Sequence, residues 1–69
     1  MNAEDLELML NPLTFHPFMV TMSDGFALPV NDARDTLLTD RLLVIKHRNL
    51  IYQIPFRAIA HTSERGENL

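Results

Sequence analysis

The chain has no cysteine in its 69 residues, and this combination limits how it can be stabilised. A domain of this length buries only about 60% of the surface that its unfolded form exposes, so its own core gives a small margin of stability. Natural domains of this size usually add disulfides, a metal site or self-association. Without cysteine, disulfides and thiolate metal sites are excluded. We therefore expect one domain that associates with copies of itself.

The absence of cysteine is also typical of proteins from a reducing compartment. No apolar run approaches the roughly 20 residues that are needed to cross a bilayer. The first residues, MNAEDLELML, are acidic, whereas an export signal begins with basic residues. We expect a cytoplasmic protein with no membrane segment and no export signal.

The spacing of the apolar residues predicts one short helix followed by strands. Asn2 is suited to cap a helix over residues 3–10, and Asn11 and Pro12 are suited to end it. Period-two alternation then predicts strands over residues 18–22 and 26–30, with the turn Ser23-Asp24-Gly25 between them. The remaining strand-forming segments are residues 36–39, 42–45, 50–54 and 58–62.

These elements favour a mostly β domain. Pro29 cannot donate a backbone hydrogen bond, so it predicts either that its strand lies at a sheet edge or that it marks a bulge. One N-terminal α-helix followed by about five short antiparallel strands predicts a small, strongly bent SH3-like barrel. We assign residues 1–63 to this single domain and expect residues 64–69 to form a disordered C-terminal tail.

Charge is distributed unevenly along the chain. Residues 1–40 contain seven acids and a single base, Arg34, whereas residues 41–63 contain four bases and no acid. Two interpretations remain open at this point. The two charges occupy separate faces, one of which attracts anions, or the two halves pair in one sheet and neutralise each other.

Groupings typical of catalysis or metal binding are missing from the sequence. His16, His47 and His61 lie far apart and have no carboxylate at metal-ligand spacing. The aspartates of residues 32–40 lack the ligand spacing of a calcium loop. Only two glycines are present, and no serine lies in a nucleophile elbow. We expect no enzymatic activity, no cofactor and no metal.

Aromatic residues lie among the bases of the second half. A nucleic-acid base could stack on Tyr52 or Phe56 while Arg41 or Arg57 meets a phosphate, an arrangement that suits single strands. The alternative is that the phenylalanines belong to the core and that Tyr52 is half-buried. The candidate RNA-binding residues are Arg41, Lys46, His47, Arg48, Tyr52, Phe56 and Arg57.

The order of these features resembles the Sm-like family, which includes the bacterial RNA chaperone Hfq. The resemblance is carried by the helix at residues 3–10, by the strand and turn MVTMSDG, and by the segment DRLLVIKHRNLIYQIPFRAIAHTS. It implies a ring of about five to seven subunits, in which the edge strand of one subunit pairs with that of the next.

The resemblance also implies where RNA would be held. In the family, a Tyr-Lys-His triplet meets RNA just before the last strand, and residues 55–57 match it with an aromatic and a cation in Phe56 and Arg57. Residues 40–42 match a turn that holds the base, with Leu42 in place of an aromatic residue.

The predicted function is a non-catalytic binding module that holds single-stranded RNA by stacking and phosphate contacts. Lys46, His47 and Arg48 are predicted to be outer phosphate contacts. The alternative is a structural or interaction protein of the same barrel class that binds a protein partner and no nucleic acid.

Overall fold

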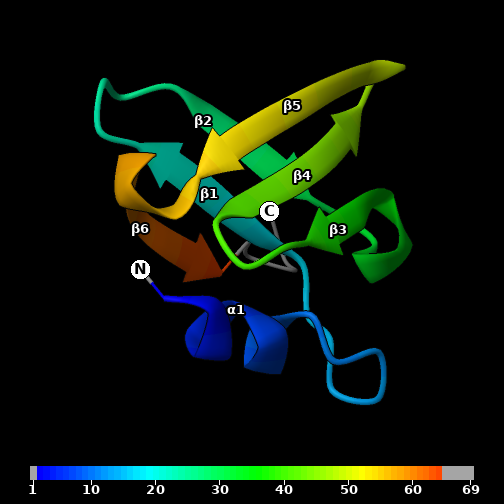
Figure 1. Ribbon diagram of the computed structural model, residues 1–69. Helices are drawn as coiled ribbons and strands as arrows, with labels where there is room; N and C mark the ends of the chain where they lie inside the picture. Colours follow the sequence, from blue (N-terminus) through cyan, green and yellow to red (C-terminus); the bar gives the residue numbers. More distant parts are fainter. Residues whose placement is uncertain (1, 65–69) are drawn as a thin grey trace.

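The computed structural model describes residues 2–64, which form one helix, six strands and two short 3-10 helices (Figure 1). In chain order the elements are α1 (Ala3–Met9), β1 (Phe18–Met22), β2 (Ala27–Val30), η1 (Ala33–Asp35), β3 (Thr36–Leu38), β4 (Leu42–His47), β5 (Leu50–Pro55), η2 (Phe56–Ala58) and β6 (Ile59–Glu64). The predicted mostly β domain with an N-terminal helix is confirmed. No helix in this part of the chain is long and apolar enough to cross a membrane.

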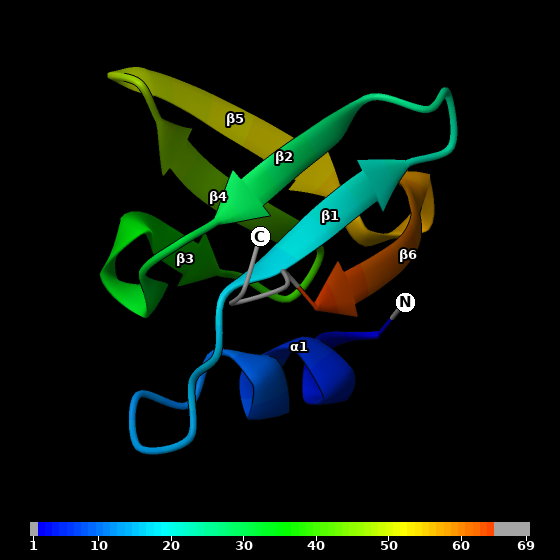
Figure 2. The ribbon, with the colours of Figure 1, turned by 180° about the vertical axis from the view of Figure 1, so that it is seen from behind.

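The strands form two antiparallel sheets of three strands each, in the orders β2-β1-β6 and β3-β4-β5. Figures 1 and 2, which view the chain from opposite sides, show one sheet behind the other and α1 beneath both. Within residues 2–64 no strand pairing joins the two sheets, so these residues do not form a closed barrel. Residues 2–64 contain six strands rather than about five, one for each strand-forming segment of the sequence, and the short Thr36–Leu38 pairs with β4.

The core lies between the two sheets and is closed at one end by α1. Its buried side chains come from α1, from both sheets and from five of the six strands: Leu6, Phe18, Val20, Leu28, Val30, Leu43, Ile45, Ile54 and Ile59. Alternate residues of β1 and β2 are buried, which confirms the period-two interpretation of those two segments. Alternate residues are buried in β4 as well, although its sequence is apolar at successive positions. Burying each of these side chains contributes about 1.5–3 kcal/mol.

The helix begins as the sequence predicts. Asn2 Oδ1 accepts a hydrogen bond from the backbone N–H of Asp5 at 2.9 Å, and the acidic first turn favours the helix dipole. The helix ends one residue earlier than predicted, with Leu10 as its C-cap. Leu6 is fully buried and docks the helix on the sheets.

The first hairpin has the predicted turn but a shorter second strand. Asp24 Oδ1 accepts from the N–H of Phe26 at 2.9 Å, and Gly25 has a φ of 93°. Strand β2 begins at Ala27, so Phe26 lies outside the strand that was predicted from residue 26. Its side chain is 51% exposed, so the alternative interpretation that places the phenylalanines in the core is wrong for Phe26. The edge prediction for the strand that contains Pro29 is confirmed.

The second hairpin joins β4 to β5 through a two-residue turn. Arg48 and Asn49 have φ values of 54° and 64°, as a primed hairpin turn requires. After β5, the single turn of η2 leads the chain from one sheet to the other. Strand β6 then continues through Glu64, so the first residue of the tail predicted to be disordered belongs to a strand. Residues 65–69 of that tail lie outside the described residues.

Candidate functional site

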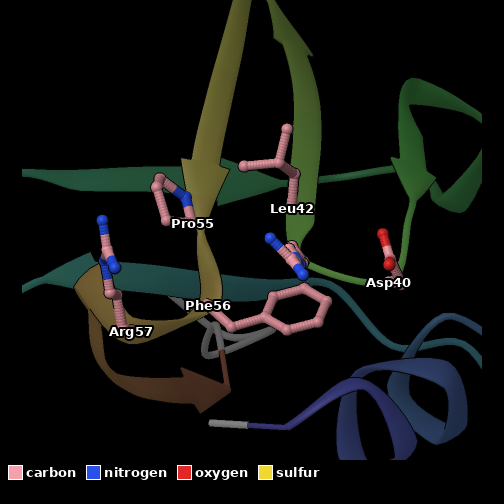
Figure 3. Close-up of a pocket in the computed structure, with 6 residues that line it drawn as sticks. Asp40, Leu42, Pro55, Phe56 and Arg57 are labelled. Atoms are coloured by element: carbon pink, nitrogen blue, oxygen red, sulfur yellow. The ribbon is translucent and has the colours of Figure 1, made fainter.

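A pocket of about 380 Å³ opens where β4 begins and β5 ends (Figure 3). It is lined by Asp40, Arg41, Leu42, Pro55, Phe56 and Arg57. These are the two segments, residues 40–42 and 55–57, that the Sm-like resemblance matches to RNA contacts. They are separated by 12 residues of chain and meet because the β4–β5 hairpin brings its two ends together.

Backbone bonds hold the two segments beside each other. Leu42 pairs with Pro55 at the last position of the β4–β5 register. One step further, the N–H of Phe56 donates to the carbonyl oxygen of Arg41 at 3.0 Å. The hairpin register therefore continues past the strands into η2 and places Arg41 next to Phe56.

The turn before β4 is closed by one threonine. Thr39 Oγ1 accepts from the N–H of Arg41 at 3.2 Å and from the N–H of Leu42 at 2.9 Å. The N–H of Thr39 in turn donates to the carbonyl oxygen of Leu42 at 2.9 Å. These bonds define the backbone of the turn that carries Asp40 and Arg41.

The pocket combines an aromatic side chain with two cations. Phe56 is half-buried and packs against the core, whereas Arg41 and Arg57 are exposed. In Figure 3, Arg57 and Asp40 stand on opposite sides of the Phe56 ring. A planar group could lie against the ring while a guanidinium forms paired hydrogen bonds to an anionic group beside it.

Neither pocket arginine is neutralised within the described part of the chain. The ion pair found among residues 2–64 joins Arg34 Nη2 to Asp32 Oδ2 at 2.8 Å, in η1 and away from the pocket. Hydrogen bonds from the side chain and backbone of Arg34 hold the pKa of Asp32 below its usual range. Arg34, the basic residue of the first half, is thus paired, whereas no acid of residues 2–64 forms an ion pair with Arg41 or Arg57.

The acidic first half and the basic second half of the chain pair in the same sheets without neutralising each other through ion pairs among residues 2–64. The two halves of the chain do share sheets, since β1 pairs with β6 and β3 pairs with β4. Among residues 2–64, however, no side-chain ion pair joins an acid of the first half to a base of the second half. Within residues 2–64, strand pairing across the halves therefore brings no acid of the first half into an ion pair with the bases of the second half.

Three of the predicted contacts lie at the opposite end of the β4–β5 hairpin. Lys46 and His47 end β4, and Arg48 is in the turn that follows. Lys46 is five positions after Arg41 along the extended chain, a span of about 16 Å. These three residues form a second basic group, distinct from the pocket.

Tyr52 is placed on the inner side of its sheet. It pairs with Ile45, whose side chain is buried, and it is itself half-buried. Its ring lies 6.2 Å from that of Phe26, measured between centroids, with the planes tilted by 36°. Tyr52 packs beside the core, as the alternative interpretation of the aromatic residues expected, and does not line the pocket.

The outer face of the β3-β4-β5 sheet is a surface that the sequence analysis missed. In the sheet register Leu37 stands beside Val44, and Lys46 stands beside Ile51. Leu37 is 63% exposed and Ile51 is 61% exposed. The signal was present in the segment from Leu42 to Ile45, which is apolar at successive positions and therefore has apolar side chains on both faces of its strand.

The histidines are not brought together. His16 and His61 are exposed, and His47 is half-buried at the end of β4. Within residues 2–64 no group of three or more His, Asp or Glu side chains is arranged to hold a metal ion.

Comparisons with protein-family models, with curated proteins and with solved structures found no match to this chain.

Proposed function

We propose that this protein is a non-catalytic, Sm-like binding module that holds single-stranded RNA in the pocket formed by Asp40–Leu42 and Pro55–Arg57. The observation that carries the proposal is the meeting of Arg41, Phe56 and Arg57 in one pocket. We propose that the fold is an open form of the small SH3-like barrel. Two three-stranded sheets share one core, which supports this assignment.

The pocket chemistry supports a single strand rather than a duplex. An unpaired base exposes its ring face, and a stacked base on an aromatic side chain contributes about 1–3 kcal/mol. Phe56 provides such a side chain, and Arg41 and Arg57 provide cations for the neighbouring phosphates. A base inside a duplex is already stacked on both sides and has no face free for Phe56.

The second basic group extends this surface. Lys46 lies about 16 Å along the hairpin from Arg41, and His47 and Arg48 follow it. A strand that leaves the pocket along β4 reaches these cations, which then act as outer phosphate contacts. Tyr52 faces the core side of the sheet and has no part in this path.

We propose further that the working unit is a homo-oligomer, in the form of a ring of about five to seven subunits. Strands β2, β6, β3 and β5 each have one edge that is unpaired within residues 2–64. The exposed Leu37 and Ile51 add apolar surface that a second copy would cover. Native mass spectrometry tests this part, because each subunit adds 7.9 kDa; a monomer at micromolar concentration would contradict it.

A second candidate function is a module that binds a protein partner and no nucleic acid. The exposed apolar face of the β3-β4-β5 sheet favours it, since such faces are typical of protein contacts. The two candidates differ in a simple measurement. Partners that remain bound to the protein after nuclease treatment, together with no affinity for RNA, would support this second function.

RNA binding is tested by fluorescence anisotropy with short U-rich and A-rich RNAs at two salt concentrations. The proposal expects binding at micromolar protein that weakens as salt rises. Phe56→Leu should weaken binding by about 1–3 kcal/mol, because leucine retains apolar volume but has no ring face. Phe26→Leu is the matched control, since Phe26 is partly exposed but outside the pocket. Equal affinities for both variants and the wild type would refute the proposed site.

A further inference from the structure

The pocket contains one group that phosphate binding does not use. Asp40 lies on its rim, on the side of Phe56 opposite to Arg57 (Figure 3). The side chain is exposed, and no described residue forms an ion pair with it, although Arg41 is its neighbour in the chain. A free carboxylate repels phosphate, so a site for phosphate alone gains nothing from Asp40.

The backbone at Asp40 is held in a closed turn. It lies in the turn that the hydroxyl and amide of Thr39 close, two residues before the Leu42–Pro55 pair. Both sides of the pocket are thus anchored to the same hairpin end. A base stacked on Phe56 would therefore share the pocket with the Asp40 carboxylate on one side and Arg57 on the other.

The chemistry of a carboxylate then selects among the four bases. An ionised carboxylate only accepts hydrogen bonds, and its two oxygens accept two parallel donors. Guanine has two adjacent donors, N1–H and the N2 amino group, on its pairing edge. Uracil has a single N–H between two carbonyl oxygens, and adenine and cytosine each have one amino group next to a ring nitrogen that accepts. Only guanine presents two donors with no acceptor facing the second oxygen.

We propose that Asp40 makes the pocket selective for guanine in single-stranded RNA. This inference rests on the proposed RNA-binding function and adds the identity of the base. Phe56 stacks the guanine, Asp40 accepts from its N1–H and N2–H groups, and Arg41 and Arg57 bind the flanking phosphates. The two N–H donors of guanine then compensate the negative charge of Asp40, which would otherwise repel the phosphates of the RNA.

The test uses U-rich RNAs that differ at one central position, which is G, A, C or U, with binding to the full chain followed by fluorescence anisotropy. The wild type is expected to bind the G-containing RNA about tenfold more tightly than the other three, the size of a good bidentate contact. Asp40→Asn should reduce this preference to less than about twofold, because an amide offers a donor as well as an acceptor and pairs with other bases.

A matched control separates base selection from a general charge effect. Asp35→Asn removes the same charge from the exposed Asp35 of η1, outside the pocket. This variant should keep the preference for guanine. If Asp40→Asn strengthens binding to all four RNAs equally and leaves their order unchanged, Asp40 acts through charge alone and the inference is wrong. Equal wild-type affinity for the four RNAs would also overturn it while leaving the RNA-binding function intact, whereas no binding to any of them would overturn both.

Discussion

The separation of the two basic groups leads to a quantitative prediction about salt. The paired substitution Arg41→Ala with Arg57→Ala removes both pocket cations, and Lys46→Ala with Arg48→Ala removes two cations at the far end of the hairpin. Both variants change the net charge by the same amount. They differ only in which cations remain, so they separate contact at the pocket from overall attraction.

The expected magnitude follows from the geometry. Each phosphate neutralised on a single strand contributes about −0.7 to the slope of log affinity against log salt. A very short RNA that fills the pocket meets two arginines, so its slope should be about −1.4 in the wild type. The far cations are about 16 Å away, which is twice the Debye length of about 8 Å at physiological salt. Their removal should leave this slope nearly unchanged, whereas removal of the pocket arginines should bring it close to zero.

The assay is a salt titration of binding by fluorescence anisotropy with RNAs of two lengths. For a longer RNA that spans the hairpin, both paired variants should lose slope, because the strand then meets both basic groups. Equal loss of slope in the two variants on the short RNA would refute the reasoning. It would mean that attraction depends on total charge and that the pocket has no special role.

Three further predictions concern folding, all measured by thermal or urea unfolding. Leu43→Ala should lower the free energy of unfolding by about 2–5 kcal/mol, because Leu43 is fully buried. Leu13→Ala, at a side chain that is 92% exposed, should change it by less than about 0.5 kcal/mol. Similar losses in the two variants would contradict the assigned core. Replacing the turn by Arg48→Asn with Asn49→Gly should raise stability by about 1 kcal/mol, since both positions have positive φ, and a loss would argue against a primed turn. The pKa of Asp32 is lowered from 3.8 by its bonds to Arg34, so the stabilising effect of Asp32 is present above pH 3.8 and is lost as pH falls through the folded pKa. The difference in unfolding free energy between wild type and Asp32→Asn should therefore shrink in acid. A constant difference would contradict the ion pair.

Much of the local structure could be predicted from short stretches of sequence. Asn2 and the acidic residues after it predicted the helix start, and Asp24-Gly25 predicted the first hairpin turn. The alternation in residues 18–22 predicted β1 and its buried face. These features depend on backbone preferences and hydrogen bonds within a few residues, so the neighbouring sequence carries the whole signal.

The candidate site could be predicted only in part from the sequence. Phe56, Arg57 and Arg41 were selected through a family resemblance and through their residue types, which do not specify a distance. Lys46 is closer in the sequence to Arg41 than Phe56 is, but it lies at the other end of the hairpin. Sequence proximity was misleading here because an extended strand moves the chain about 3.3 Å with each residue.

The sequence by itself determined the class of the domain, the helix with its cap, and most strand positions, because each depends on local periodicity. Only the tertiary structure decided that the strands divide into two sheets, that Phe26 is exposed, and that Arg41 meets Phe56. The physical reason is that strand pairing and burial depend on contacts between residues far apart in the chain. The register that pairs Leu42 with Pro55 is such a contact, and it creates the pocket.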